Sequence, residues 1–196
     1  KRLREGLPKK CLLVIDSAYS EYVVEKDYSD SLSYAKKRND IIVTRTFSKI
    51  FGISSQRLGW AYCPKDIATT LNKLRPAFNI NSFAQLLGEY VLDDKEFLEK
   101  SIKHNLFWKE WLTVKFKEMG FKVIPSVANF ILIRFKNQRA SSLLADELAK
   151  NNIYVRKLEN YGLPDCLRIT IGLEKDLKKL ITVTKRIFKE NNYDLI

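Results

Sequence analysis

The stretch that constrains this chain most is a β-branched apolar run that ends beside a lysine. The run is Ile41–Thr46, and Phe47-Ser48-Lys49 follows it directly. Such a run predicts a buried strand, so the lysine is delivered into the loop at the strand's end. Gly52 then permits a backbone turn that other residues rarely adopt. Arg57 follows eight residues after the lysine and carries a forked cation that suits a phosphate.

The lysine has two interpretations at this point. A lysine beside apolar strand residues can be partly desolvated, which favours its uncharged amine and frees it for imine chemistry. Most lysines at strand ends are solvated cations instead. The tetrapeptide Thr46-Phe47-Ser48-Lys49 does not by itself separate the two.

A second apolar run, Cys11–Asp16, ends in an acid and is typical of a fully buried parallel strand. The carboxyl end of such a strand is where α/β sheets bind ligands. Tyr19 places a phenol three residues further on. Alone, Asp16 is better explained as a cap of the following turn, but with Lys49 after the next strand a ligand site is the better explanation.

The order of the expected elements indicates an α/β protein in two parts. Strands are expected at about 11–16, 41–46, 58–62, 121–126, 129–135, 153–156 and 167–172, and helices at about 31–38, 64–74, 82–92, 94–119, 141–150 and 174–190. Pro64 opens its helix at the first position, and Ser82 and Ser141 or Ser142 are the expected caps of two others. Gly120 closes the long helix, whose aromatic residues we expect to pack between domains. We expect the domain boundary at this helix, with domains of 1–94 and 95–196.

Composition excludes several classes of protein. A hydrophobic content of 45% indicates a globular chain, and no apolar run approaches the ~18 residues that span a bilayer. The net charge of +12 leaves nucleic acid open as a partner, but the lysines are scattered along amphipathic helices, so we expect no nucleic-acid or membrane partner. No targeting segment is evident at the N-terminus, which predicts a cytoplasmic protein.

Cysteine, histidine and methionine usage adds three expectations. Cys11, Cys63 and Cys166 are far apart and odd in number, so we expect them to be reduced and mostly buried. His104 is the only histidine, which disfavours a Ser-His-Asp triad and a histidine metal site; we expect no metal, and a surface position for His104. Met119 is the only methionine, so the chain reads as the back portion of a longer protein.

Several of these segments resemble one enzyme family. Thr46-Phe47-Ser48-Lys49 with Arg57-Leu58-Gly59 is similar to the lysine segment of the fold-type I pyridoxal-phosphate-dependent aminotransferases, and more narrowly of the histidinol-phosphate aminotransferases. Asp16-Ser17-Ala18-Tyr19 and Pro76-Ala77-Phe78-Asn79-Ile80-Asn81 resemble two further segments. The chain departs from the family at Ser17, usually glutamate, at the intervening Ala77, and at Ile50, often a small residue.

The resemblance implies a part of the large cofactor-binding domain followed by an α+β small domain, and it assigns roles to residues. Lys49 would hold pyridoxal 5'-phosphate and move the substrate proton, Asp16 would pair with the ring nitrogen, and Tyr19 would bond the ring's phenolic oxygen. The phosphate contacts would be Ser48 and Arg57, with Thr46 a further candidate. Arg168 would grip the substrate carboxylate and Arg156 a substrate phosphate; for each, a salt bridge within the small domain is the alternative.

The implied reaction is amino transfer between L-histidinol phosphate and 2-oxoglutarate in histidine biosynthesis. An aromatic-amino-acid aminotransferase and a threonine-phosphate decarboxylase are alternatives on the same fold, and a basic binding protein is the alternative outside it. The family also implies a homodimer when full length and an N-terminal half that this chain does not carry, so we expect little activity from the chain alone.

Overall fold

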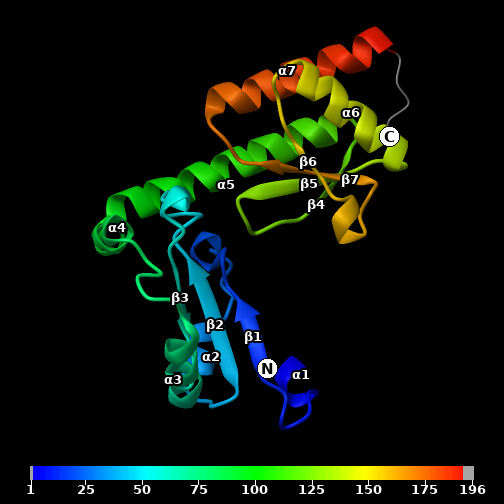
Figure 1. Cartoon of the computed structure of the whole chain (residues 1–196). Helices are drawn as coiled ribbons and strands as arrows, with labels where there is room; N and C mark the ends of the chain where they lie inside the picture. Colours follow the sequence, from blue (N-terminus) through cyan, green and yellow to red (C-terminus); the bar gives the residue numbers. More distant parts are fainter. Residues whose placement is uncertain (1, 192–196) are drawn as a thin grey trace. The chain divides into compact units, whose positions relative to one another are not determined.

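The computed structural model describes residues 2–191, which form two compact units that divide between Ile102 and Lys103 (Figure 1). Helix α5 (Lys95–Glu118) runs from the first unit into the second. The domain boundary expected between residues 94 and 95 stays a prediction.

The first unit is built on a three-stranded sheet in the order β1-β2-β3. Its elements are α1 (Arg2–Glu5), β1 (Leu13–Asp16), η1 (Ser20–Tyr22), α2 (Ser31–Ala35), β2 (Ile41–Thr46), η2 (Ser54–Gln56), β3 (Gly59–Tyr62), α3 (Lys65–Leu74) and α4 (Ser82–Asp93). β1 and β2 are parallel, whereas β3 runs antiparallel to β2. Only the loop 47–58, without a crossover helix, joins β2 to β3, and a connection of this kind suits antiparallel neighbours.

One face of this sheet carries the unit's small core. Ile41 and Val43 of β2 pack with Ala35 of α2 and with the half-buried Leu13 and Ile15 of β1. The expectation that β1 is fully buried is wrong, because β1 is an edge strand and Val14, on the other face, is 56% exposed.

Three helix ends differ from, or refine, the expected caps. Pro64 lies one position before α3 as its N-cap residue. Asn81, not Ser82, caps α4, because its Oδ1 accepts the Ala84 N–H at 2.8 Å. The Asp94 carboxylate accepts the Phe97 N–H at 2.9 Å at the start of α5, and Gly120 ends that helix with a φ of +91°.

The second unit is an antiparallel four-stranded sheet in the order β4-β5-β7-β6 with helices packed against it. Its elements are β4 (Lys122–Ile124), β5 (Phe130–Arg134), α6 (Gln138–Lys150), β6 (Arg156–Lys157), η3 (Glu159–Tyr161), β7 (Cys166–Thr170) and α7 (Glu174–Asn191). Trp108, Leu112 and Phe116 of α5 join α6, α7 and one face of the sheet in a single core. Strand alternation therefore leaves the even-numbered residues of β5 and β7 on the face away from that core.

Two local expectations in this unit are wrong. Asn137 caps α6, while Ser141 lies inside the helix, where its hydroxyl bonds the carbonyls of Gln138 and Pro164. Of the strand expected at 153–156, only residue 156 is in a strand: β6 begins there and ends at Lys157.

The cysteines and the histidine also differ from expectation. All three cysteines are free, but only Cys166 is buried, since Cys11 and Cys63 lie in partly open segments of the small first unit. His104 is half-buried rather than on the surface, because its Nε2 lies 2.9 Å from the Gly172 carbonyl. Within residues 2–191, no helix combines the length and apolarity needed to span a bilayer, and no cluster of three potential metal ligands is found.

Candidate active site

The loop that carries Lys49 is held by short local hydrogen bonds. The Thr46 hydroxyl accepts the Ser48 N–H at 3.0 Å, and the Lys49 carbonyl accepts the Gly52 N–H at 3.1 Å. Gly52 has a φ of +75°, the unusual turn expected from the sequence. The loop therefore presents Lys49 in a defined turn immediately after β2.

The Lys49 amine is exposed and has no carboxylate partner among the described residues. Its Nζ lies 5.4 Å from the centre of the Tyr19 ring. The expected desolvation is not found, because the lysine lies beyond the strand, beside a loop rather than beside apolar strand side chains. The structure nevertheless brings Tyr19 and Lys49, from two separate loops, into contact.

Ser48 and Arg57 converge next to the lysine. Arg57 Nη1 donates to the Ser48 Oγ at 3.0 Å and to the Ser54 carbonyl at 2.8 Å. Arg57 adopts the left-handed conformation, with a φ of 52°, at the end of η2. Its guanidinium is exposed and meets no acid within the described part of the chain. A hydroxyl and two cations with no compensating carboxylate form an anion-binding set.

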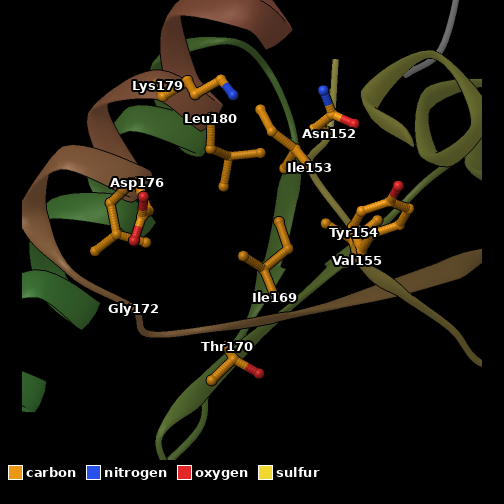
Figure 2. A pocket seen from close by; sticks show the side chains of 11 residues that line it. Asn152, Ile153, Tyr154, Val155, Ile169, Thr170, Gly172, Asp176, Lys179 and Leu180 are labelled. Atoms are coloured by element: carbon orange, nitrogen blue, oxygen red, sulfur yellow. The ribbon is translucent and has the colours of Figure 1, made fainter. Parts of the chain in front are cut away.

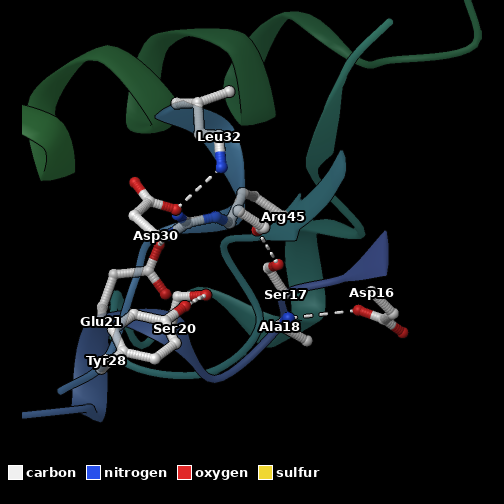
Figure 3. A network of polar contacts seen from close by, with 10 residues as sticks. Asp16, Ser17, Ala18, Ser20, Glu21, Tyr28, Asp30, Leu32 and Arg45 are labelled. Atoms are coloured by element: carbon white, nitrogen blue, oxygen red, sulfur yellow. Dashed lines mark hydrogen bonds and ion pairs between the residues drawn. The ribbon is translucent and has the colours of Figure 1, made fainter. Parts of the chain in front are cut away.

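Asp16 ends β1 opposite Thr44 of the parallel strand β2. Its Oδ1 accepts the Ala18 N–H at 3.1 Å, so it does cap the turn (Figure 3). The carboxylate is exposed, and its second oxygen has no partner among residues 2–191. Because the carboxyl ends of parallel neighbours share one edge of a sheet, Asp16 lies at the same edge as the lysine loop.

Sequence analysis did not predict a part-buried ionic network near this edge. Arg45 of β2 is only 9% exposed and pairs with Glu21 at 2.6 Å and with Asp30 at 2.7 Å (Figure 3). The sequence did contain a signal for it, because Arg45 lies two residues after Val43 and so shares the strand face of Ile41 and Val43, which face the core. An arginine on the core face of a strand requires acidic partners.

Arg156 and Arg168 lie in the second unit as cross-strand neighbours on β6 and β7. Arg168 stacks over the Phe130 ring at 5.1 Å, and its buried Nε has no hydrogen-bond partner. Arg156 Nη2 donates to the Tyr161 hydroxyl at 3.3 Å. Neither forms the salt bridge that was its alternative explanation, in the part of the chain described. The relation of this pair to Lys49 stays a prediction.

A cavity of about 240 Å³ lies elsewhere in the second unit, between residues 152–155, β7 and the start of α7 (Figure 2). Its floor is apolar and includes Ile153, Ile169 and Leu180. Neither Arg156 nor Arg168 lines this cavity.

Comparison with known proteins gives a consistent picture. The sequence matches the family described as aminotransferase class I and II over residues 3–183. It is 40% identical over 191 residues to a histidinol-phosphate aminotransferase of Maricaulis maris, covering 96% of this chain and 53% of that protein. The chain thus spans about half the length of the curated relatives it matches.

Solved structures show the same fold. The histidinol-phosphate aminotransferase of Clostridium acetobutylicum superposes with a TM-score of 0.86 at 26% identity, over 98% of this chain and 58% of that one. The Sinorhizobium meliloti histidinol-phosphate aminotransferase, in complex with pyridoxal-5'-phosphate, gives 0.87 at 22% identity, over 95% and 52%. The predicted fold class is confirmed.

Proposed function

The chain belongs to the aminotransferase class I and II family, and from this premise we propose that it is the C-terminal portion of a pyridoxal-phosphate-dependent histidinol-phosphate aminotransferase. The observation that carries the proposal is the loop after β2. There an exposed Lys49 directly follows Ser48, whose hydroxyl bonds Arg57, and no acid among the described residues neutralises the two cations. A cofactor that carries both an aldehyde and a phosphate group matches this set of an amine, a hydroxyl and a guanidinium.

The residues present fit pyridoxal 5'-phosphate. Lys49 offers the amine that holds the aldehyde, and Ser48 with Arg57 offers donors for the phosphate. Asp16, whose second carboxylate oxygen is free of partners within residues 2–191, would bind a protonated ring nitrogen, and Tyr19 would bond the phenolic oxygen. Thr46 contributes by fixing the loop.

When bound, the cofactor supplies an electron-withdrawing ring that stabilises negative charge on the substrate carbon. The chain's own part in the reaction is positioning and proton movement. Lys49, released by the substrate amine, would carry the proton to and from the reacting carbon. Asp16 would keep the ring nitrogen protonated, which maintains the ring's electron-withdrawing character.

Arg156 and Arg168 support an anionic substrate. The two arginines are paired in register on neighbouring strands, and neither has an acidic partner among the described residues. A phosphate monoester in one half-reaction and a dicarboxylate in the other would satisfy both. We therefore propose L-histidinol phosphate and 2-oxoglutarate as the substrates, in histidine biosynthesis.

We further propose a homodimer that acts in the cytoplasm on small molecules, without nucleic-acid or membrane partners. α4 exposes a stripe of Phe83, Leu86 and Tyr90 on one helix face, which supports an apolar interface. The free cysteines support a reducing compartment. Salt-sensitive nucleic-acid binding that persists in Lys49→Ala would favour the basic binding protein instead.

The decisive experiment traps the cofactor on the chain. The purified protein is mixed with pyridoxal 5'-phosphate, reduced with borohydride, and mapped by peptide mass spectrometry. We expect the label at Lys49 and its loss in Lys49→Ala, whereas Lys65→Ala, which removes another exposed lysine of the first unit, keeps it. Label spread over all exposed lysines would contradict a cofactor site.

Substrate choice needs a kinetic comparison on the full-length protein. L-histidinol phosphate, aromatic amino acids and threonine phosphate compete for one site, and the first should give the highest kcat/KM. We expect little activity from the 196-residue chain alone. Full activity of that chain would contradict the proposal that a further half completes the site.

A further inference from the structure

Arg45 lies on the opposite face of β2 from Thr44 and Thr46, the face that packs into the first unit's core. Its side chain joins two acids near the edge where a ligand would bind. Both terminal nitrogens are used, at 2.6 Å to Glu21 and 2.7 Å to Asp30, and the guanidinium lies 6.0 Å from the Trp60 ring centre.

The two acids bracket residues 22–29 of the connection from β1 to α2. Glu21 belongs to η1, two residues after Tyr19, and Asp30 caps α2 by accepting the Leu32 N–H at 3.0 Å. Arg45 thus clamps both ends of the connection from β1 to α2 (Figure 3).

Two weaker ties close the same loop. The Ser17 and Ser31 hydroxyls lie 2.7 Å apart at its base, and the Tyr28 hydroxyl donates to the Ser20 Oγ at 2.8 Å. Ser17 is buried, so the residue that departs from the family pattern is used within this network. Neither of these hydroxyl contacts reaches β2; the Ser17 N–H bonds the Thr44 carbonyl of that strand at 3.0 Å, and the Arg45 clamp adds ties to β2 at Glu21 and Asp30.

We propose that Arg45 is a positioning residue for the cofactor site, acting through Glu21 and Asp30 on Tyr19. This inference rests on the proposed function. The strand that holds Arg45 also delivers Lys49 four residues later, so one rigid element fixes the lysine directly and Tyr19 through the clamp. Removing the clamp would release Glu21, two residues after Tyr19, and Asp30 from β2, so the segment that carries Tyr19 would be held less firmly beside the Lys49 amine.

The first test needs no cofactor. In the full chain, Arg45→Gln should make amide hydrogen exchange across 17–31 at least about threefold faster, because a local opening becomes easier. Arg38→Gln is the matched control, since Arg38 also pairs with an acid, Asp40, in the same unit but on the surface. If Arg45→Gln does not fold, Arg45→Lys and Glu21→Gln replace it, and the same acceleration is expected.

The second test separates positioning from general stability. With pyridoxal 5'-phosphate bound, Tyr19→Phe should alter the cofactor's absorbance spectrum and weaken its binding. Arg45→Gln should reproduce both changes, and the double variant should lose about tenfold in affinity, like each single variant, rather than about a hundredfold. Arg38→Gln should leave the spectrum unchanged.

The outcomes are distinct. If the wild-type chain takes up cofactor at Lys49 while Arg45→Gln leaves its spectrum unchanged, or if the Tyr19 and Arg45 effects simply add, the positioning role is wrong and the proposed function stands. If the wild-type chain takes up no cofactor at Lys49, the proposed function fails and this inference with it. Unchanged exchange across 17–31 in the variant contradicts the clamp itself.

Discussion

Replacing Arg57 by asparagine tests whether the hydroxyl–guanidinium pair is a phosphate site. Arg57 has a φ of 52°, and asparagine tolerates this conformation, so the backbone is preserved. A phosphate oxygen beside the pair formed by Ser48 Oγ and Arg57 Nη1, whose atoms lie 3.0 Å apart, would gain a charge-assisted hydrogen bond. Such a bond contributes about 1.5–3 kcal/mol, and solvent exposure places Arg57 at the lower end.

A loss of about 1.4 kcal/mol in binding free energy raises the dissociation constant for pyridoxal 5'-phosphate about tenfold. The assay is absorbance titration of the protein with pyridoxal 5'-phosphate and, in parallel, with pyridoxal, which lacks the phosphate. Arg57→Asn should weaken only the phosphorylated ligand, and Arg57→Lys, which keeps the charge but not the fork, should fall between. Equal weakening of both ligands would refute the reasoning, because Arg57 would then act by bracing the loop through the Ser54 carbonyl.

Three further predictions concern stability and reactivity. Gly52→Ala should lower the free energy of unfolding by about 1 kcal/mol in denaturant titration, because alanine is strained at a φ of +75°; an unchanged midpoint would show that the turn relaxes. Leu144→Ala, at a fully buried position, should lower the free energy of unfolding by about 2–5 kcal/mol, and Leu143→Ala, at a half-buried position, should lower it clearly less. Burial raises the pKa of the Cys166 thiol, so thiol-reactive probes should label the half-buried Cys63 faster than Cys166 at neutral pH; the reverse order would contradict the burial.

Elements with a strong local signal were predictable from the sequence. Ile41–Thr46 is a strand with the predicted bounds, and Gly52 and Gly120 adopt the positive φ values that their positions required. Thr46, Ser48, Lys49 and Arg57 are close in sequence, so their convergence follows from one turn.

Two kinds of feature could not be predicted from the sequence alone. One is which of two neighbouring residues caps a helix, and the other is contacts between residues that are far apart in the chain. Asn81 and Asn137 cap helices where nearby serines were expected, because either residue type can accept the same N–H. The Arg45 clamp joins residues 15 and 24 positions apart, which no short motif encodes. The exposure of Val14 likewise depends on what covers the other sheet face, which the strand's own pattern does not specify.

The positions where local rules are broken support the site more strongly than any single motif. Arg57 is a non-glycine residue at positive φ, and Arg156 faces Arg168 without a described acid between them. Arg57 lies in a sparsely populated backbone region, and Arg156 and Arg168 place like charges at paired positions of neighbouring strands. Each of these arginines lies where a phosphate or carboxylate could bind it. Both units thus hold arginines without an acidic partner among the described residues, as expected of a protein whose cofactor and substrate are both anionic.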